Sequence, residues 1–341
     1  MRQMWRRTAL GVFVAVPVLV FIFFRTDGTE TIEALGDANY ALIPPAVTLL
    51  IAAIWLQAVR WRYLLRPLVD VSPARLYPLV FIGHLGNSVL PLRAGDVLRA
   101  FVLRRREGIS RAATLGTLAV EHILDGVMLV GLLLIFIAAA NAGEGLWELA
   151  LVSGIIFGGA SGALIAAAVW QEGSMRVAEV GISRLPDHWR DDGRRWISSF
   201  LAGTRALRSV EVAVIVFATT ICFWLMVSAV YLIVGEAFHI DEGVDTYLLV
   251  TAAANLAFSV PLTQGGLGSF EFLVRQTLIF AEVDAAVATA YALALHALII
   301  GSMVCAGLIS LWMVGLSVRE ISDEVTAGEE EEPEAKASAR R

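Results

Sequence analysis

Two polar stretches, each broken by proline and glycine, interrupt otherwise apolar sequence and repeat the same order of residue types. The first spans residues 87–99 and the second spans 255–275. Each begins with an asparagine, continues through Pro-Leu and a glycine turn, and ends with an acidic residue followed by an arginine. A matched pair of interrupted hydrophobic segments in two halves of a chain is the best sequence indication of a transporter's binding site. The pair therefore favours a carrier over a soluble enzyme.

The first break offers groups that could bind an anion. Pro91 removes a backbone donor and Gly95 loosens the helix. Backbone left unpaired at membrane depth is tolerated only inside protein or beside water, so the break predicts a polar cavity. Freed amides at a helix start, next to Arg93 and Arg99, favour an anion such as a phosphate. The alternative is that Asp96 pairs with one of these arginines and the segment only packs.

Two acids lie in the middle of a later apolar run. Glu121 and Asp125 are four residues apart and so share a helix face, with His122 beside them. Ionisable groups inside a span usually face a pathway or a partner charge. One interpretation is a buried ion pair, with partners among Arg93, Arg99, Arg104 and Arg111. The other is a proton relay through Glu121, His122 and Asp125.

The second stretch repeats the spacing of acid and base in Glu271 and Arg275. Gly265, Gly266 and Gly268 resemble a phosphate loop only superficially, because no Lys-Ser or Lys-Thr follows, and we expect no nucleotide site. We expect His84 and His296, each in an apolar run, to make hydrogen-bonded helix contacts, with a titrating functional role as the alternative.

The Arg60-Trp-Arg62-Tyr segment has two interpretations. It is either an interfacial anchor or a site that captures an anionic lipid headgroup between helices. Cys222 and Cys305 lie within apolar runs, which argues against a disulfide framework or a zinc site. We find no catalytic constellation and expect no metal and no cofactor.

Composition identifies the setting of these residues. The 341-residue chain is 57% hydrophobic, with a mean hydropathy of +0.72. Only 17% of its residues are charged, against roughly 25% in globular domains. Soluble helices carry a polar face, whereas residues 8–24, 40–59 and 212–234 carry none. The pattern predicts an all-α, polytopic integral membrane protein.

Charges that flank the apolar runs predict the topology through the positive-inside rule. Full spans are expected at 8–24, 40–59, 112–140, 149–170, 212–234 and 285–318. The segment 76–104 has basic flanks at both ends and 247–281 has acidic flanks at both ends. We predict re-entrant hairpins there, the first opening to the cytoplasm and the second to the outside. Both chain termini are then cytoplasmic, and the scarcity of lysine suggests a prokaryotic cytoplasmic membrane.

These segments predict one membrane domain over 1–318. Its halves, about 1–145 and 146–318, form an inverted-topology repeat. The alternative is eight ordinary spans. A cytoplasmic loop at 171–209 is expected to form amphipathic helix at the membrane surface, and 319–341 to be a disordered acidic tail.

The motifs resemble the flippase-like family, the membrane domain of lysylphosphatidylglycerol synthases. The resemblance covers nearly the whole chain and is carried by Arg60-Trp-Arg62-Tyr-Leu-Leu, Asn87-x3-Pro91-x-Arg93-Ala-Gly95-Asp96-x2-Arg99, Glu121-x3-Asp125 and Pro261-x3-Gly265-Gly266-x-Gly268-x2-Glu271. Two residues depart from the family pattern: His122 stands where members usually carry Arg, and Asp96 where Glu is frequent. In bifunctional relatives a soluble aminoacyl-transferase domain follows, and the membrane part is implicated in moving lipid between leaflets. Since this chain ends soon after its last span, lysyl transfer is not expected from it alone.

The leading hypothesis is a non-enzymatic carrier that translocates, or helps to translocate, a lipid with an anionic headgroup or a polyprenyl-phosphate-linked glycan. Arg93 and Arg99 would bind phosphate, while Asp96, Glu121, Asp125 and Glu271 would gate, balance charge or couple protons. The alternative is a membrane scaffold that partners a glycosyltransferase or a lipid-modifying enzyme. No nucleic-acid partner is expected. The candidate substrate-binding residues are Arg60, Arg62, Asn87, Pro91, Arg93, Gly95, Asp96, Arg99, Glu121, Asp125, Asn255, Pro261, Gln264, Gly265, Gly266, Gly268, Glu271 and Arg275.

Overall fold

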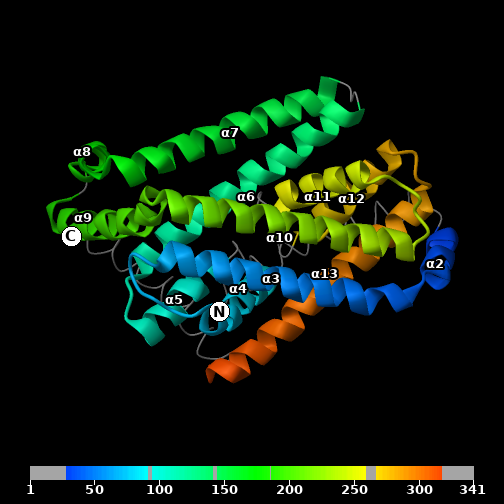
Figure 1. The fold of residues 1–341 in the computed structure, drawn as a ribbon, viewed down its shortest axis with the longest axis horizontal. Coiled ribbons are helices and arrows are strands. Elements are labelled where there is room, and N and C mark those ends of the chain that lie inside the picture. The colour runs from blue at the N-terminus through cyan, green and yellow to red at the C-terminus, as the bar shows by residue number, and fades with distance from the viewer. Residues whose placement is uncertain (1–27, 91–93, 141–143, 185, 259–265, 317–341) are drawn as a thin grey trace.

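The computed structural model describes residues 28–90, 94–140, 144–184, 186–258 and 266–316, and the described secondary structure is helical (Figure 1). The predicted all-α class is confirmed. The expected first span and the acidic tail lie outside the described residues. In chain order the helices are α2 (Gly28–Asp37), η1 (Tyr40–Leu42), α3 (Ile43–Leu65), α4 (Pro73–Val89), α5 (Gly95–Glu107), α6 (Arg111–Ala140), α7 (Glu144–Val169), α8 (Gln171–Ile182), α9 (Asp187–Gly203), η3 (Thr204–Arg208), α10 (Val210–Ala237), α11 (Val244–Phe258), α12 (Ser269–Phe280) and α13 (Ala285–Val314).

Among these helices, four are long and apolar enough to cross a membrane. They are Tyr40–Leu65, Arg111–Ile137, Val210–Ala237 and Ala285–Val314, with a mean hydropathy of 2.0 to 2.3. A fifth candidate is the pair Gly154–Val169 and Gln171–Ile182, which bends by 111°. A span needs roughly 20 apolar residues, so the chain is a multi-pass helical membrane protein.

The ends of the long helices follow from local sequence. Pro44 lies in the first turn of α3, where the missing backbone N–H of proline is tolerated. The side chain of Asp284 accepts hydrogen bonds from the backbone N–H groups of Ala286 and Val287 at 2.8 and 3.1 Å, which caps α13. At the other end Gly315 takes the left-handed conformation, with φ of 70°, and α13 stops there.

Helices α4 and α5 form an antiparallel hairpin around the first polar break. Near the turn, the N–H of Gly95 donates to the Oδ1 atom of Asn87 at 2.9 Å. At the far ends of the two arms, Arg75 and Glu107 form an ion pair at 2.6 Å. The beginning of α4 and the end of α5 therefore lie side by side, as the basic flanks of 76–104 predicted.

Helices α11 and α12 pack against each other around the second break. The residues just before α11 and just after α12 line one shallow pocket of about 440 Å³, which includes Asp241 and Asp284. The arms of this second hairpin thus also begin and end near each other. Helix α13 starts at this pocket, whereas its last turn contacts the end of α5, where Arg106 donates to the carbonyl of Val314 at 2.8 Å.

The predicted loop 171–209 consists mainly of α8, α9 and η3. Helix α9 packs on the first turns of α6, where Gly116 lies against the backbone of Phe200. Trp196 stacks on Phe200 and is 52% exposed. The helical structure agrees with the sequence prediction, and its contact with a membrane surface stays a prediction.

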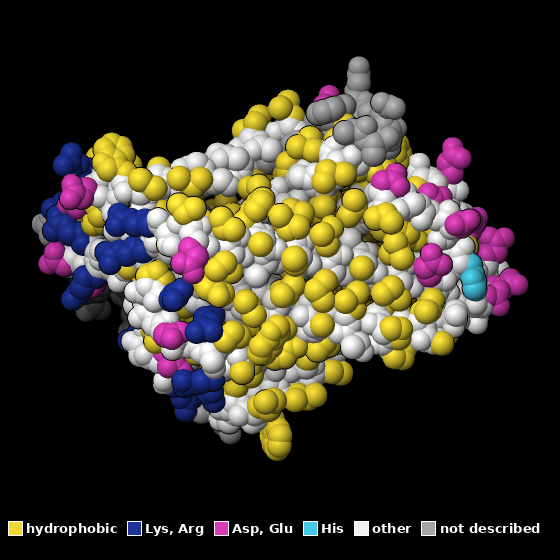
Figure 2. Space-filling model, in the orientation of Figure 1, with side chains coloured by type: hydrophobic (Ala, Val, Ile, Leu, Met, Phe, Trp, Pro, Cys, Tyr) yellow, Lys and Arg dark blue, Asp and Glu magenta, His cyan; other side chains and the backbone are white. Residues whose placement is uncertain are grey.

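Charge is segregated to the two ends of the molecule. Figure 2 shows a band of hydrophobic side chains between an arginine-rich end, where α8 and α9 lie, and an acidic end near α2. Segment 28–37, which lies between the predicted spans 8–24 and 40–59, is a helix that packs on α13. Thr31 on this helix is buried.

Candidate functional site

Both hairpins contribute to one cavity of about 570 Å³ within the bundle. The first hairpin supplies Asn87, Ser88 and Asp96, and the second supplies Asn255 and Gly266. Helices α3, α6, α7, α10 and α13 complete the walls, mostly with apolar and aromatic side chains. An apolar pocket with a few convergent polar groups is the usual form of a small-molecule site.

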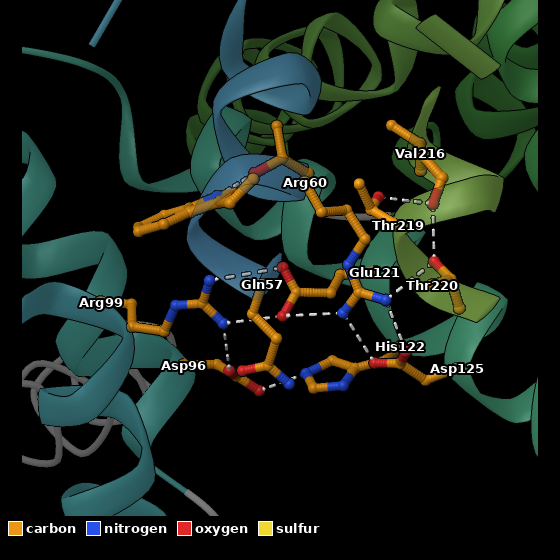
Figure 3. A network of polar contacts seen from close by, with 12 residues as sticks. Gln57, Arg60, Asp96, Arg99, Glu121, His122, Asp125, Val216, Thr219 and Thr220 are labelled. Carbon is orange, nitrogen blue, oxygen red and sulfur yellow. Dashed lines mark hydrogen bonds and ion pairs between the residues drawn. The ribbon is translucent and has the colours of Figure 1, made fainter. Parts of the chain in front are cut away.

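Glu121 is the centre of a buried charge network on one wall of this cavity (Figure 3). Its carboxylate accepts from the guanidinium of Arg99 at 3.1 and 3.4 Å, and it also lies 3.4 Å from Arg60. Glu121 is 2% exposed and Arg60 is 1% exposed. Because isolated charges are too costly to bury, each side chain in this network depends on the others.

Asp125, one turn along α6, holds Arg60 in a bidentate pair. The two Arg60–Asp125 contacts measure 2.6 and 3.0 Å. Thr220 accepts from the same guanidinium at 2.9 Å, and the indole N–H of Trp224 donates to Asp125 at 3.0 Å. Helices α3, α6 and α10 are thereby connected through one ion pair.

Arg99 is positioned by close packing as well as by charge. Its guanidinium lies 4.1 Å from the ring centre of Trp61, whose indole N–H donates to Thr117 at 3.1 Å. A Cβ atom on Gly83 would meet the aliphatic part of the Arg99 side chain, so the small residue on α4 gives that side chain room. The cation–π contact fixes the direction of the guanidinium.

His122 and Asp96 form the most accessible contact of the network. The imidazole Nε2 atom lies 2.7 Å from a carboxylate oxygen of Asp96. The side chains are 45% and 22% exposed, and both line the cavity. Asp96 also lies 4.0 Å from Arg99, which connects this contact to the buried pairs.

Further polar side chains line the cavity. Nε2 of His84 and Oε1 of Gln57 lie 2.9 Å apart, which agrees with the expectation that His84 makes a helix contact. Asn255 donates to the hydroxyl of Tyr231 at 3.1 Å. These polar groups line the cavity together with the charged residues.

Glu271 has a different environment from the cavity acids. It is 4% exposed, accepts from the N–H of Gly268 at 2.7 Å, and lies 2.7 Å from Nδ1 of His296. The contact with Gly268 caps the first turn of α12, and the contact with His296 connects α12 to α13. Arg275 instead donates to Thr289 at 2.9 Å, so the acid and base that are four residues apart have separate partners.

The structure brings together many of the predicted site residues, but not all of them. Arg60 lies directly behind the cavity wall, in contact with two acids that line it; the predicted residues in the lining itself are Asn87, Asp96, Arg99, Glu121, Asp125, Asn255 and Gly266. Gly95 contacts the lining residue Asn87, and Gly268 begins α12. Arg62 forms an exposed pair with Asp70 at 3.3 Å, away from the cavity. Pro91, Arg93, Pro261, Gln264 and Gly265 lie outside the described residues.

Sequence reasoning missed two features of the network. It expected the partner of Glu121 and Asp125 among Arg93, Arg99, Arg104 and Arg111, and so identified Arg99 as a partner. Arg60 was predicted only as an interfacial anchor or a headgroup-binding residue. Sequence reasoning also missed Gln57, Trp61 and Trp224. The available signal was the arginine at position 60, which follows about 17 apolar or neutral residues on its own helix. Within the part of the chain that the structure describes, no group of three or more His, Cys, Asp and Glu residues is arranged to hold a metal ion.

Comparison with known proteins identifies the family to which the chain belongs. It is 28% identical over 353 aligned positions to a protein named Glycosyltransferase AglD from Haloferax volcanii. That alignment covers 92% of this chain and 55% of the relative, so the chain spans about half of the relative's length. No solved structure gives a significant match. Residues 8–307 match the family described as Lysylphosphatidylglycerol synthase TM region, and the chain therefore belongs to that family.

Proposed function

We propose that this chain is a carrier that translocates, or helps to translocate, an anionic-headgroup lipid or a polyprenyl-phosphate-linked glycan across the cytoplasmic membrane. The observation that supports this most is the shared cavity, because both interrupted hairpins contribute polar groups to it. Irregular backbone inside a membrane protein is tolerated where it lines such a space. Arg99 would bind the headgroup and the acids beside it would balance charge, while the acyl or prenyl chains stay among lipids.

The proposed mechanism is alternating access by an inverted repeat. One hairpin has its free ends near the basic end of the bundle and the other near the acidic end. Two elements arranged in this way can open a central site first to one face of the membrane and then to the other. Under the positive-inside rule the arginine-rich end faces the cytoplasm.

This orientation gives a labelling prediction. In a variant without Cys222 and Cys305, single cysteines at Ser72 and Gly108 should both react with an impermeant maleimide from the cytoplasmic face. The two positions flank the hairpin whose ends meet at the Arg75–Glu107 pair. A cysteine at Gly243 should react from the opposite face only. Labelling of positions 72 and 108 from opposite faces would contradict the re-entrant hairpin.

The carrier function can be tested by filling the cavity. Ser88 lines the cavity and hydrogen-bonds within its own helix, to the carbonyl of His84, so Ser88→Trp adds bulk without changing charge. In liposomes, the wild type should transfer labelled phosphatidylglycerol or a polyprenyl-phosphate hexose between leaflets. The variant should be slower by on the order of tenfold or more.

The matched control is Ser198→Trp on α9, where the serine is exposed and donates to the carbonyl of Arg195. This variant should keep the wild-type rate. Equal rates for wild type and Ser88→Trp, with both proteins monodisperse, would exclude passage through the cavity. Absence of lipid transfer by the wild type with either lipid would contradict the carrier function.

A scaffold is the second candidate function, and one observation favours it. The relative named as a glycosyltransferase is matched by this chain over only 55% of its length. A membrane region that accompanies such an enzyme could hold it near its lipid substrate. The scaffold function predicts co-purification with a glycosyltransferase or lipid-modifying enzyme and no transfer of lipid by the chain alone. In both functions we propose that the chain performs no group transfer itself.

A further inference from the structure

The described helices pack in two matching sets, one from each half of the chain. Helix α4 packs on α13 and α11 packs on α6, so the first arm of each hairpin lies against the last helix of the other half. The second arms, α5 and α12, pack on the last helix of their own half, and α3 packs on α10. The helices that lead into α3 and α10 follow the same pattern, since α2 packs on α13 and α9 packs on α6. Helix α6 also packs on α7, the helix with which the second half begins.

Two histidines align the last helices of the two halves, α6 and α13. His122 on α6 lies 2.7 Å from Asp96, in the first turn of α5. His296 on α13 lies 2.7 Å from Glu271, in the first turn of α12. Each imidazole therefore contacts the acid that begins the second arm of its own hairpin. A residue on α6 accordingly corresponds to the residue on α13 at the same distance from the histidine.

Helix α7 covers one strip of α6, four and eight residues after its histidine. A Cβ atom on Gly126 would meet the ring of Phe157, which lines the cavity. A Cβ atom on Gly154 would lie 3.9 Å from the side chain of Val130. Gly126 is buried, and Val130 is only 7% exposed. This strip is where the helix that begins the second half meets the last helix of the first half.

The matching strip on α13 is only partly covered by the residues that the structure describes. Ile300 and Val304, four and eight residues after His296, are half-buried, and Leu308 one turn further is 48% exposed. Ile300 also lines the cavity, as its counterpart Gly126 does. The strip is therefore an apolar surface beside the cavity that another helix can contact.

We propose that the apolar segment 8–24 packs on this strip of α13 and runs antiparallel to it, as the counterpart of α7 on α6. The segment precedes α2 in the first half, just as α7 precedes α9 in the second. It would place an apolar side chain beside Ile300, where Phe157 lies beside Gly126 in the other half. This contact is independent of the proposed function, since the segment would complete the bundle whether or not the chain transfers lipid.

Chain connectivity, length and charge support this occupant. Only residues 25–27 separate the segment from α2, which packs on α13. Ala34 on α2 lines the same pocket as Asp284, the residue that caps α13 at the acidic end. A helix as long as the segment measures about 25 Å, more than half the length of the 30-residue α13. The arginines that precede residue 8 would then lie towards the arginine-rich end of the bundle, in agreement with the positive-inside rule.

Oxidative cross-linking of the full chain in membrane vesicles tests the contact. In a background of Cys222→Ser and Cys305→Ser, Val304→Cys is combined with single cysteines placed in turn along 8–24. A disulfide forms only where two Cβ atoms come within about 4.5 Å of each other. Disulfides within one chain should form at positions of 8–24 that are about three or four residues apart, because one helix face contacts α13. Electrophoresis distinguishes links within a chain from links between chains, and mass spectrometry of the digested protein identifies the joined residues.

Two control pairs come from the described helices. Ile309→Cys is the negative control, because it is 59% exposed on the same helix but points about 140° away from Val304. Its disulfide yield with the same cysteines should be lower by on the order of tenfold. Val130→Cys with Gly154→Cys is the positive control, since α6 and α7 touch there, and this pair should join readily.

Failure of Val304→Cys to join any position of 8–24, while the positive control joins, would overturn the inference and mean that lipid covers the strip. Disulfides that form only between two chains would also overturn it and assign the strip to a second copy. Equal yields for Val304→Cys and Ile309→Cys would show that the segment does not pack on this face. None of these outcomes bears on lipid transfer, and a chain that forms the expected disulfides but transfers no lipid would contradict only the proposed function.

Discussion

Replacing Arg60 with methionine should lower the free energy of unfolding by about 3–5 kcal/mol, the usual consequence of removing one partner of a buried ion pair. The change leaves Asp125 without its bidentate partner and removes one of the two guanidiniums that contact Glu121. Thermal or denaturant unfolding in detergent, followed by circular dichroism or by loss of the monodisperse peak, measures the effect.

Arg62→Met is the matched control because it lies on the same helix, two residues further on. Its pair with Asp70 is exposed on both sides, at 39% and 71%, and such pairs contribute only about 0–1 kcal/mol. Adding Asp125→Asn to Arg60→Met should recover part of the lost stability, since it removes one of the uncompensated charges. If Arg60→Met were as stable as Arg62→Met, the network would not hold α3 and α6 together.

The long helices could be predicted from sequence because one physical effect dominates them. In a bilayer, an apolar run of about 20 residues can satisfy its backbone groups only as a helix. Predicted segments 40–59, 112–140, 212–234 and 285–318 accordingly fall inside helices α3, α6, α10 and α13, apart from a few residues at their ends. The ends differ because helix termination depends on single residues, such as Gly315, at which α13 stops.

The first hairpin could also be predicted, because its evidence is a repeated charge pattern. Basic residues on both flanks of 76–104 required the two ends to lie on one side, and the Arg75–Glu107 pair joins them. The role of Glu107 as the acid in that pair was not predictable, because it depends on how closely α4 and α5 approach.

The detailed pairing in the site could not be predicted, because it depends on contacts between distant segments. Arg60 meets Asp125 across 65 positions and Thr220 across 160 positions of sequence. Spacing along one helix placed Glu121 and Asp125 on a common face, yet it carried no information about which helix would face them. The same limit applies to Glu271, whose partner His296 lies on the next helix.

The close approach of the hairpin arms leads to a second prediction with a large effect. Gly95 begins α5 where it crosses α4, and a Cβ atom there would meet the carbonyl oxygen of Gly83 and the side-chain amide of Asn87. Backbone cannot move aside as a flexible side chain can. Gly95→Ala should therefore separate the arms and lower stability by about 1–3 kcal/mol.

Gly131→Ala on α6 is the matched control, because nothing lies within 4 Å of a Cβ atom at that position. Alanine is the better helix former by up to about 1 kcal/mol, so this control should be neutral or stabilising. The two variants add the same methyl group, and unfolding in detergent compares them directly. Asn87 and Asp96, which flank the contact, both line the cavity, so Gly95→Ala should also slow lipid transfer while Gly131→Ala does not. Equal behaviour of the two alanine variants would mean that α4 and α5 do not approach at Gly95, and that the cavity does not depend on their contact.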